Sequence, residues 1–343
     1  MRSTKSPSWI EGWAGRLLGY APVAAPPYAF ALDERRLCYG QFVRDRQGFR
    51  LRGWREVALP PDAFHSGLLG GPLRDPAAFQ SLVGALVGGI GGPHKGLKEA
   101  SLVVPDAWLR VTFTEITDVP RQGDARDEVL RWKLRRLVPF RVDELRVSAV
   151  EVEPLPVQEE PRRLLLGFGV EQLLAQIEDA FAAHGVRIGR LTNSSLALLS
   201  AVEMPPAGGS GEQGGFSFSA VVQVEADGYT LIFARGGEPV LHRYKPFTGD
   251  MPEGAQTGFI TRDLKLTRNF LDENFPGLPL GTVLLLAPPE SEPLWMDRLQ
   301  EGLGQRVVPI DGRHLPSLRS EDPVVPPWRE LAPMLGAVRQ EVV

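Results

Sequence analysis

The chain has 343 residues, of which 43% are hydrophobic, enough for one large or two medium folded domains. The 38 Lys and Arg against 42 Asp and Glu give a formal charge of -4, so no overall positive field favours nucleic acid as a partner. The single cysteine, Cys38, allows no internal disulfide and no thiol pair for a metal, and we expect it in a strand. No run approaches the ~18 apolar residues of a membrane span, and residues 1–20 lack the apolar stretch of a secretory signal. We therefore expect a globular cytoplasmic protein.

Residues 1–27 predict an amphipathic helix followed by an Ala/Pro linker. One face of the helix collects the large apolar residues Trp9, Ile10, Trp13 and Leu17. We expect this face to dock on protein. Docking on a membrane surface is the alternative, which two helix glycines and few nearby basic residues disfavour.

Residues 28–204 form the expected first domain, which opens with three strands joined by turns. Those strands are predicted over Tyr28–Asp33, Arg36–Val43 and Phe49–Val57. A helix at Pro76–Val87 and a buried strand at Ala100–Pro105 follow, a succession typical of α/β layers. The remaining predicted elements are a basic helix at Asp127–Val138, strands at Leu145–Glu153 and Arg163–Val170, a helix at Glu171–His184, a strand at Val186–Leu191 and a helix at Asn193–Val202.

Residues 205–215 are rich in Gly and Pro and predict a flexible linker between two domains. The second domain, 216–343, opens with another three-stranded meander at Phe216–Glu225, Tyr229–Arg235 and Glu238–Tyr244. It continues with a helix at Gln256–Phe275, a strand at Gly281–Ala287, a helix at Glu292–Leu303 and a strand at Gln305–Ile310. The two halves therefore repeat one plan.

This duplicated plan resembles the actin-like (ribonuclease H-like) α/β fold, which holds a nucleotide between two such halves. Within that fold, Ser101–Val111 and Arg131–Phe140 resemble the PilM family of type IV pilus assembly proteins. The first segment is a valine-rich strand with a proline, and the second is a helix that closes in a Pro-Phe pair. Ala182–Leu191 and Leu331–Arg339 are similar to later segments of the same family.

The resemblance implies an interaction subdomain inserted at about 107–185 and a partner for it. PilM proteins bind the short cytoplasmic tail of PilN, which is anchored in the membrane, in a groove bordered by this insert. The implied function is a cytoplasmic scaffold, peripheral to the inner membrane through PilN-like and other pilus assembly partners. The candidate partner-binding residues are Trp132, Arg135, Arg136, Pro139 and Phe140. We expect Leu130 and Leu137 of the same helix to be core residues.

The first nucleotide loop looks disabled. Actin-like ATPases carry a glycine and a hydroxyl in this hairpin, whereas the strand register here places Ala31 at the carboxylate position, Asp33 at the glycine and Glu34 at the hydroxyl. A carboxylate ~4 Å from a phosphate is repelled by about 1 kcal/mol even in water, and by more in a cleft.

The other two nucleotide loops are also degraded. The second hairpin keeps only Gly228 and Thr230 of the expected pattern, and the adenine loop carries Pro288 and Pro289, which lack amide donors. We therefore expect no cofactor, no catalytic residue and no enzyme activity. The alternatives are an active ATPase of the same machinery, which would need ATP and Mg²⁺, and the cytoplasmic part of a type II secretion protein.

The other candidate patterns give weaker signals. The glycines at 88–92 follow a predicted helix instead of opening one and lack a Gly-Lys-Ser/Thr ending, so we interpret them as a connector. The five histidines are scattered without the spacing of metal ligands, and we expect no metal site.

Overall fold

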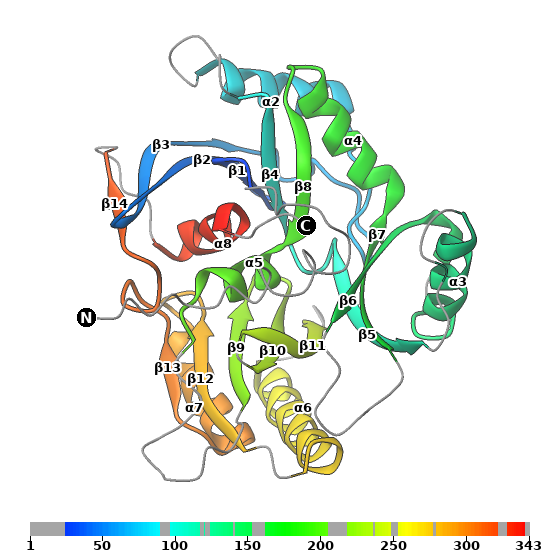
Figure 1. The fold of residues 1–343 in the computed structure, drawn as a ribbon, viewed down its shortest axis with the longest axis vertical. Helices are drawn as coiled ribbons and strands as arrows, with labels where there is room; N and C mark the ends of the chain where they lie inside the picture. Colours follow the sequence, from blue (N-terminus) through cyan, green and yellow to red (C-terminus); the bar gives the residue numbers. More distant parts are fainter. Residues whose placement is uncertain are drawn as a thin grey trace.

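The computed structural model describes residues 25–89, 97–116, 120, 124–139, 141–152, 162–204, 218–235, 237–247, 253–276, 279–321 and 328–339 (Figure 1). The predicted N-terminal helix and the 205–215 linker lie outside these residues. The described elements form two large sheets with helices on their faces, and a smaller sheet at one side (Figure 1).

The first sheet has the strand order β14-β3-β2-β1-β4-β8. Its antiparallel meander consists of β1 (Tyr28–Leu32), β2 (Arg36–Asp45) and β3 (Gly48–Ala58). On the other side of β1, β4 (Glu99–Val104) and β8 (Arg187–Asn193) run parallel to it. Gly48 permits the tight β2–β3 turn because its φ of 127° lies in the region that other residues avoid.

The second sheet repeats this order as β11-β10-β9-β12-β13. Its meander comprises β9 (Phe218–Val224), β10 (Gly228–Arg235) and β11 (Glu238–Pro246), followed by the parallel strands β12 (Leu280–Leu286) and β13 (Val307–Pro309). If the strands of each half are numbered in chain order, both sheets have the order 3-2-1-4-5, and β14 adds one more strand at the edge of the first sheet. This shared order confirms the duplicated, actin-like α/β fold that the sequence predicts.

Helices cover the first sheet on both faces because its strands alternate two sets of buried side chains. Phe30 and Leu37 face α2 (Pro76–Gly89) and α4 (Glu171–Ala182), while Ala29 and Cys38 face α8 (Trp328–Arg339). Cys38 is thus a buried strand residue, as predicted. Helix α5 (Ser194–Ala201) lies between the two sheets and packs on α8, and α6 (Glu253–Asn274) and α7 (Glu292–Leu303) cover the second sheet (Figure 1).

The end of the chain returns to the first sheet. We expected all of residues 216–343 to belong to the second domain, but β14 and α8 pack with the first. Strand β14 (Leu318–Ser320) pairs with β3, and α8 packs on β1, β4 and α5. Gly336 allows the close crossing of α8 over α5, because a Cβ there would overlap the carbonyl oxygen of Ala197. Leu331, Met334 and Leu335 bury the apolar face of α8 beneath the first sheet.

The insert is a small sheet of order β5-β7-β6 with one helix on its outer face. It comprises β5 (Arg110–Ile116), α3 (Asp124–Arg135), the 3-10 turn η1 (Val142–Glu144), β6 (Leu145–Val152) and β7 (Arg162–Val170). The expected insert ran to residue 185, but α4 is buried against α2 in the first half, and Gly185 ends the segment after α4 with a φ of 74°. Leu130 is a core residue as predicted, whereas the prediction for Leu137 was wrong because α3 ends before it.

Candidate functional site

A cleft of about 850 Å³ lies where the three expected nucleotide loops meet. It is lined by the β1–β2 turn, the β9–β10 turn and the loop between β12 and α7. Asp33, Glu34 and Pro288 all line it, so the structure brings these sequence-predicted residues together. Gly228 and Thr230 are strand residues of β10 instead, and Thr230 is buried.

The β1–β2 turn uses its own amide groups. Asp33 Oδ1 accepts hydrogen bonds from the backbone N–H groups of Arg35 (2.7 Å) and Arg36 (2.9 Å). The Arg36 guanidinium in turn contacts Glu330 (2.8 Å) and Glu56 (3.7 Å). Amide groups of the kind that bind phosphate in such a turn are therefore satisfied by a carboxylate of the chain itself.

The β9–β10 turn presents buried acids. Glu225 Oε1 accepts a hydrogen bond from Gln223 Nε2 (3.2 Å), and Asp227 Oδ2 accepts one from the Tyr244 hydroxyl (3.1 Å). Burial, followed by the nearby carboxylates of Asp106 and Asp227, holds the pKa of Glu225 well above its usual range. Burial also raises the pKa of Asp227. This turn therefore favours protonated carboxyls and offers no positive group to an anion.

The loop between β12 and α7 turns its donors inward. The carbonyl of Pro288 accepts hydrogen bonds from the backbone N–H groups of Ser291 (3.0 Å) and Glu292 (2.9 Å), and from the Ser291 hydroxyl (3.3 Å). Pro288 and Pro289, which both line the cleft, carry no N–H group. The two prolines therefore contribute no amide donor to this rim of the cleft.

Carboxylates outnumber cations around the cleft. The acidic lining residues are Asp33, Glu34, Glu56, Glu225, Asp227, Glu290 and Glu330, against Arg35, Arg36 and Arg329. Among the described residues, Cys38, Glu56 and Glu330 place potential metal ligands within 4.8 Å of one another. Arg36 already contacts both carboxylates, and burial raises the pKa of the Cys38 thiol to about 12, so this group favours the resident guanidinium over a metal ion.

A buried polar cluster joins the two halves below the cleft, and sequence reasoning missed it. Ser195 Oγ lies between the Asp106 carboxylate, to which it is hydrogen-bonded, and His242 Nε2 at 2.9 Å. His242 Nδ1 has no hydrogen-bond partner in the described structure. The bonds are satisfied when His242 Nε2–H donates to Ser195 Oγ and the Ser195 hydroxyl donates to Asp106.

This direction of bonding is the reverse of that needed for a nucleophile, in which the serine donates to the histidine. The side chains of His242 and Asp106 are also fully buried, at 0% exposure, so no substrate reaches them. The cluster therefore ties β11 of the second half to the first half. The sequence held no signal for it, because the three residues lie far apart along the chain.

Helix α3, which carries the predicted partner-binding residues Trp132 and Arg135, lies on the outer side of the insert, away from the first sheet (Figure 1). Trp132 is 49% exposed on α3, and Arg135, Arg136 and Pro139 are exposed beside it. Phe140 lies outside the described residues. These side chains form a surface over α3, and they line neither of the two hollows described in this section.

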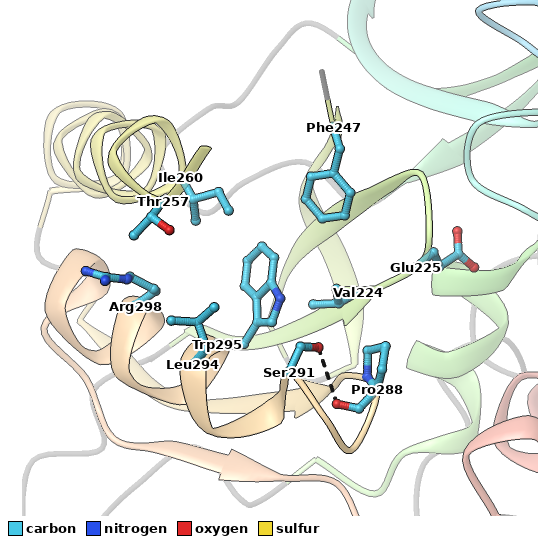
Figure 2. Close-up of a pocket in the computed structure, with 10 residues that line it drawn as sticks. All are labelled: Val224, Glu225, Phe247, Thr257, Ile260, Pro288, Ser291, Leu294, Trp295 and Arg298. Carbon is cyan, nitrogen blue, oxygen red and sulfur yellow. Dashed lines mark hydrogen bonds between the residues drawn. The ribbon is translucent and has the colours of Figure 1, made fainter. Parts of the chain in front are cut away.

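A second hollow, of about 200 Å³, adjoins the cleft in the second half (Figure 2). Its walls are mainly apolar and come from the end of β11, from α6 and from α7. The pocket shares Val224, Glu225 and Pro288 with the cleft. Sequence reasoning gave no indication of this pocket.

No family model matches the sequence, and no curated protein matches it. Among solved structures, a chain of the PilM-PilN type IV pilus biogenesis complex matches with a TM-score of 0.63 at 14% identity, over 93% of this chain and 97% of that one. The cytoplasmic domain of EpsL, an inner membrane component of the type II secretion system of Vibrio cholerae, matches with a TM-score of 0.45 at 11% identity. The match covers 92% of this chain and 95% of that domain. A protein of unknown function with an actin-like ATPase fold from Bacteroides thetaiotaomicron matches with a TM-score of 0.46 at 10% identity. The match covers 83% of this chain and 91% of that one.

Within the described ranges, no helix combines the length and apolar character needed to cross a membrane. The likeness to the pilus complex extends over nearly the whole of both chains and agrees with the duplicated order of the two large sheets. The chain therefore has an actin-like fold of the PilM kind.

Proposed function

We propose that this protein is a non-enzymatic scaffold of a type IV pilus assembly platform. It is held at the inner membrane by the cytoplasmic tail of a membrane-anchored, PilN-like protein, and it contacts other components of the platform. The likeness in fold to a chain of the PilM-PilN complex supports the assignment to pilus assembly.

One observation carries the proposal that ATP is not turned over. The cleft keeps its place between the halves, but its rim offers Asp33, Glu34 and two prolines where phosphate and adenine need backbone N–H donors. The amides of the first turn are bonded to Asp33 itself. Binding of ATP at this rim would require breaking those bonds and placing phosphates beside the carboxylates of Asp33 and Glu34.

The surface over α3 supports the proposed binding of a short tail. Lys133 Nζ and the Arg136 guanidinium lie 5.7 and 5.5 Å from the centre of the Trp132 ring, which forms an exposed apolar platform with flanking positive charge. Leu137, 48% exposed, extends the apolar surface. Tryptophan and arginine are the residues that most often dominate binding energy at protein interfaces.

A thermal-shift titration with MgATP tests the absence of nucleotide binding. A ligand present at 100 times its Kd stabilises a protein by about 2.7 kcal/mol, which raises the Tm by several degrees. We expect no shift in Tm at millimolar MgATP. A reproducible rise would contradict the proposal and favour an ATPase.

A pull-down with the synthetic cytoplasmic tail of a PilN-like protein tests the partner surface. We expect Trp132→Ala/Arg135→Ala to lose the tail with little change in Tm, because both side chains are exposed and Arg135 makes only a surface ion pair with Asp143. The matched control is Leu266→Ala/Lys265→Ala on α6, where an exposed leucine again adjoins a cation in a surface ion pair. Equal capture by both double variants would place the interface elsewhere.

A further inference from the structure

The pocket of Figure 2 has a rigid aromatic wall. The Trp295 ring packs on Tyr229 with 5.0 Å between ring centres, and on Phe247 with 6.1 Å. Trp295 belongs to the buried core of the second sheet, and Ile260 of α6 lines the pocket on the side of α6 (Figure 2). Because these side chains are fixed by packing, a ligand of matching shape loses little affinity to reorganisation.

The mouth of the pocket is accessible. Leu294, on the first turns of α7, lines the pocket and is 44% exposed. A cavity of ~150 Å³ with apolar walls accepts one benzene ring. The volume of about 200 Å³ therefore suits a single ring or a branched apolar group with a short polar arm.

One cation lies at the end of this apolar pocket. Arg298 follows Leu294 by one turn of α7 and stands near Thr257 of α6 (Figure 2). Its Nη1 contacts Glu301 at 3.3 Å, and its buried Nε has no hydrogen-bond acceptor in the described structure. A guanidinium with an unsatisfied donor favours a planar anion that accepts two parallel hydrogen bonds, as a carboxylate does.

We propose that this pocket binds a small carboxylic acid with a single apolar ring or branched apolar body. The apolar body lies between Trp295 and Ile260, and the carboxylate pairs with Arg298. At the opposite end, Glu225 would repel the acid only if it were ionised, and burial raises its pKa. This site is independent of the proposed partner surface, which lies on the insert.

The probe is 3-phenylpropionate, and its binding to the full chain is compared with that of its neutral amide and of phenethylamine. Sodium acetate at equal ionic strength is the salt control. For a ligand of this size we expect a Kd in the roughly millimolar range, seen as a rise in Tm and as perturbed indole signals in NMR spectra. The acid should bind at least about tenfold more tightly than the amide, as expected when a hydrogen bond to a charged group is lost.

The substitution Arg298→Met should raise the Kd for 3-phenylpropionate by about tenfold or more. Lys265→Met is the matched control, because Lys265 also pairs with Glu301 but does not line the pocket. Leu294→Trp, at an exposed position, should fill the mouth and abolish binding. Equal affinity for acid and amide, or unchanged binding in Arg298→Met, would overturn the proposal.

Discussion

Replacing Ser195 with alanine tests the buried cluster that joins the two halves. The serine hydroxyl is the link between Asp106, which follows β4, and His242, which belongs to β11. Alanine removes that hydroxyl but keeps the backbone N–H that donates to Asp106 Oδ2 at 3.1 Å. The perturbation therefore breaks the link while leaving the helix start intact.

The expected loss in stability follows from the bonds removed and from what can replace them. A hydrogen bond to a charged group contributes about 1.5–3 kcal/mol, and a buried donor left unsatisfied costs about 1–3 kcal/mol. His242 Nε2 already lies 3.4 Å from Asp106 Oδ1, so a small shift lets the ring donate directly to the carboxylate. That shift offsets part of the cost of leaving the His242 donor unsatisfied. We therefore expect the free energy of unfolding to fall by about 2–3 kcal/mol.

Urea unfolding monitored by tryptophan fluorescence measures this change. Ser200→Ala is the matched control on the same helix, because the Ser200 hydroxyl bonds back to the Leu196 carbonyl of its own helix. We expect that control to stay within about 0.5 kcal/mol of the natural protein. A loss below about 0.5 kcal/mol in Ser195→Ala, or one no larger than in the control, would refute the assignment of an interdomain tie.

Three further predictions concern single positions. Cys38, whose pKa burial raises to about 12, should resist a thiol reagent at pH 8 and react fully once urea unfolds the chain, as followed by absorbance. Glu225→Gln should raise stability at neutral pH. Because the folded-state pKa of Glu225 is raised, ionisation destabilises the natural protein as pH rises above the ordinary value of about 4.3, so the gain should vanish near pH 4 in urea titrations. Gly336→Ala should lower the Tm strongly or abolish soluble expression because its Cβ overlaps the Ala197 carbonyl, whereas Gly258→Ala on α6, with open space around it, should raise the Tm slightly.

The two meanders could be predicted because their signals are local. Strands of alternating or continuous apolar residues are joined by short polar turns, and each half repeats that pattern within about thirty residues. Asp33, Glu34 and Pro288 then converge because equivalent loops of a duplicated fold lie at the same edge of their sheets. The cleft was therefore predictable from the sequence together with the resemblance.

The return of the chain to the first sheet was not predictable from local pattern. Strand β14 is three residues long, too short to show a period, and α8 contains Pro333 within its apolar face. The sequence did not predict the cluster around Ser195 or the pocket beside Trp295, for another reason. Their members are single residues of common types, and only the packing of α5, α7 and β11 brings them together.

The contacts of the insert bear on why this fold would serve as a scaffold. Arg163 of β7 donates to the Val240 carbonyl of β11, and the Arg110 guanidinium of β5 lies 4.8 Å from the centre of the Tyr244 ring. Arg110 also donates to the Leu68 carbonyl of the first half at 2.8 Å, so the insert is tied to both halves. A cleft that exchanged a ligand by opening would have to break these contacts. Under the proposed function, these contacts would join both halves to the surface over α3 on which the partner acts.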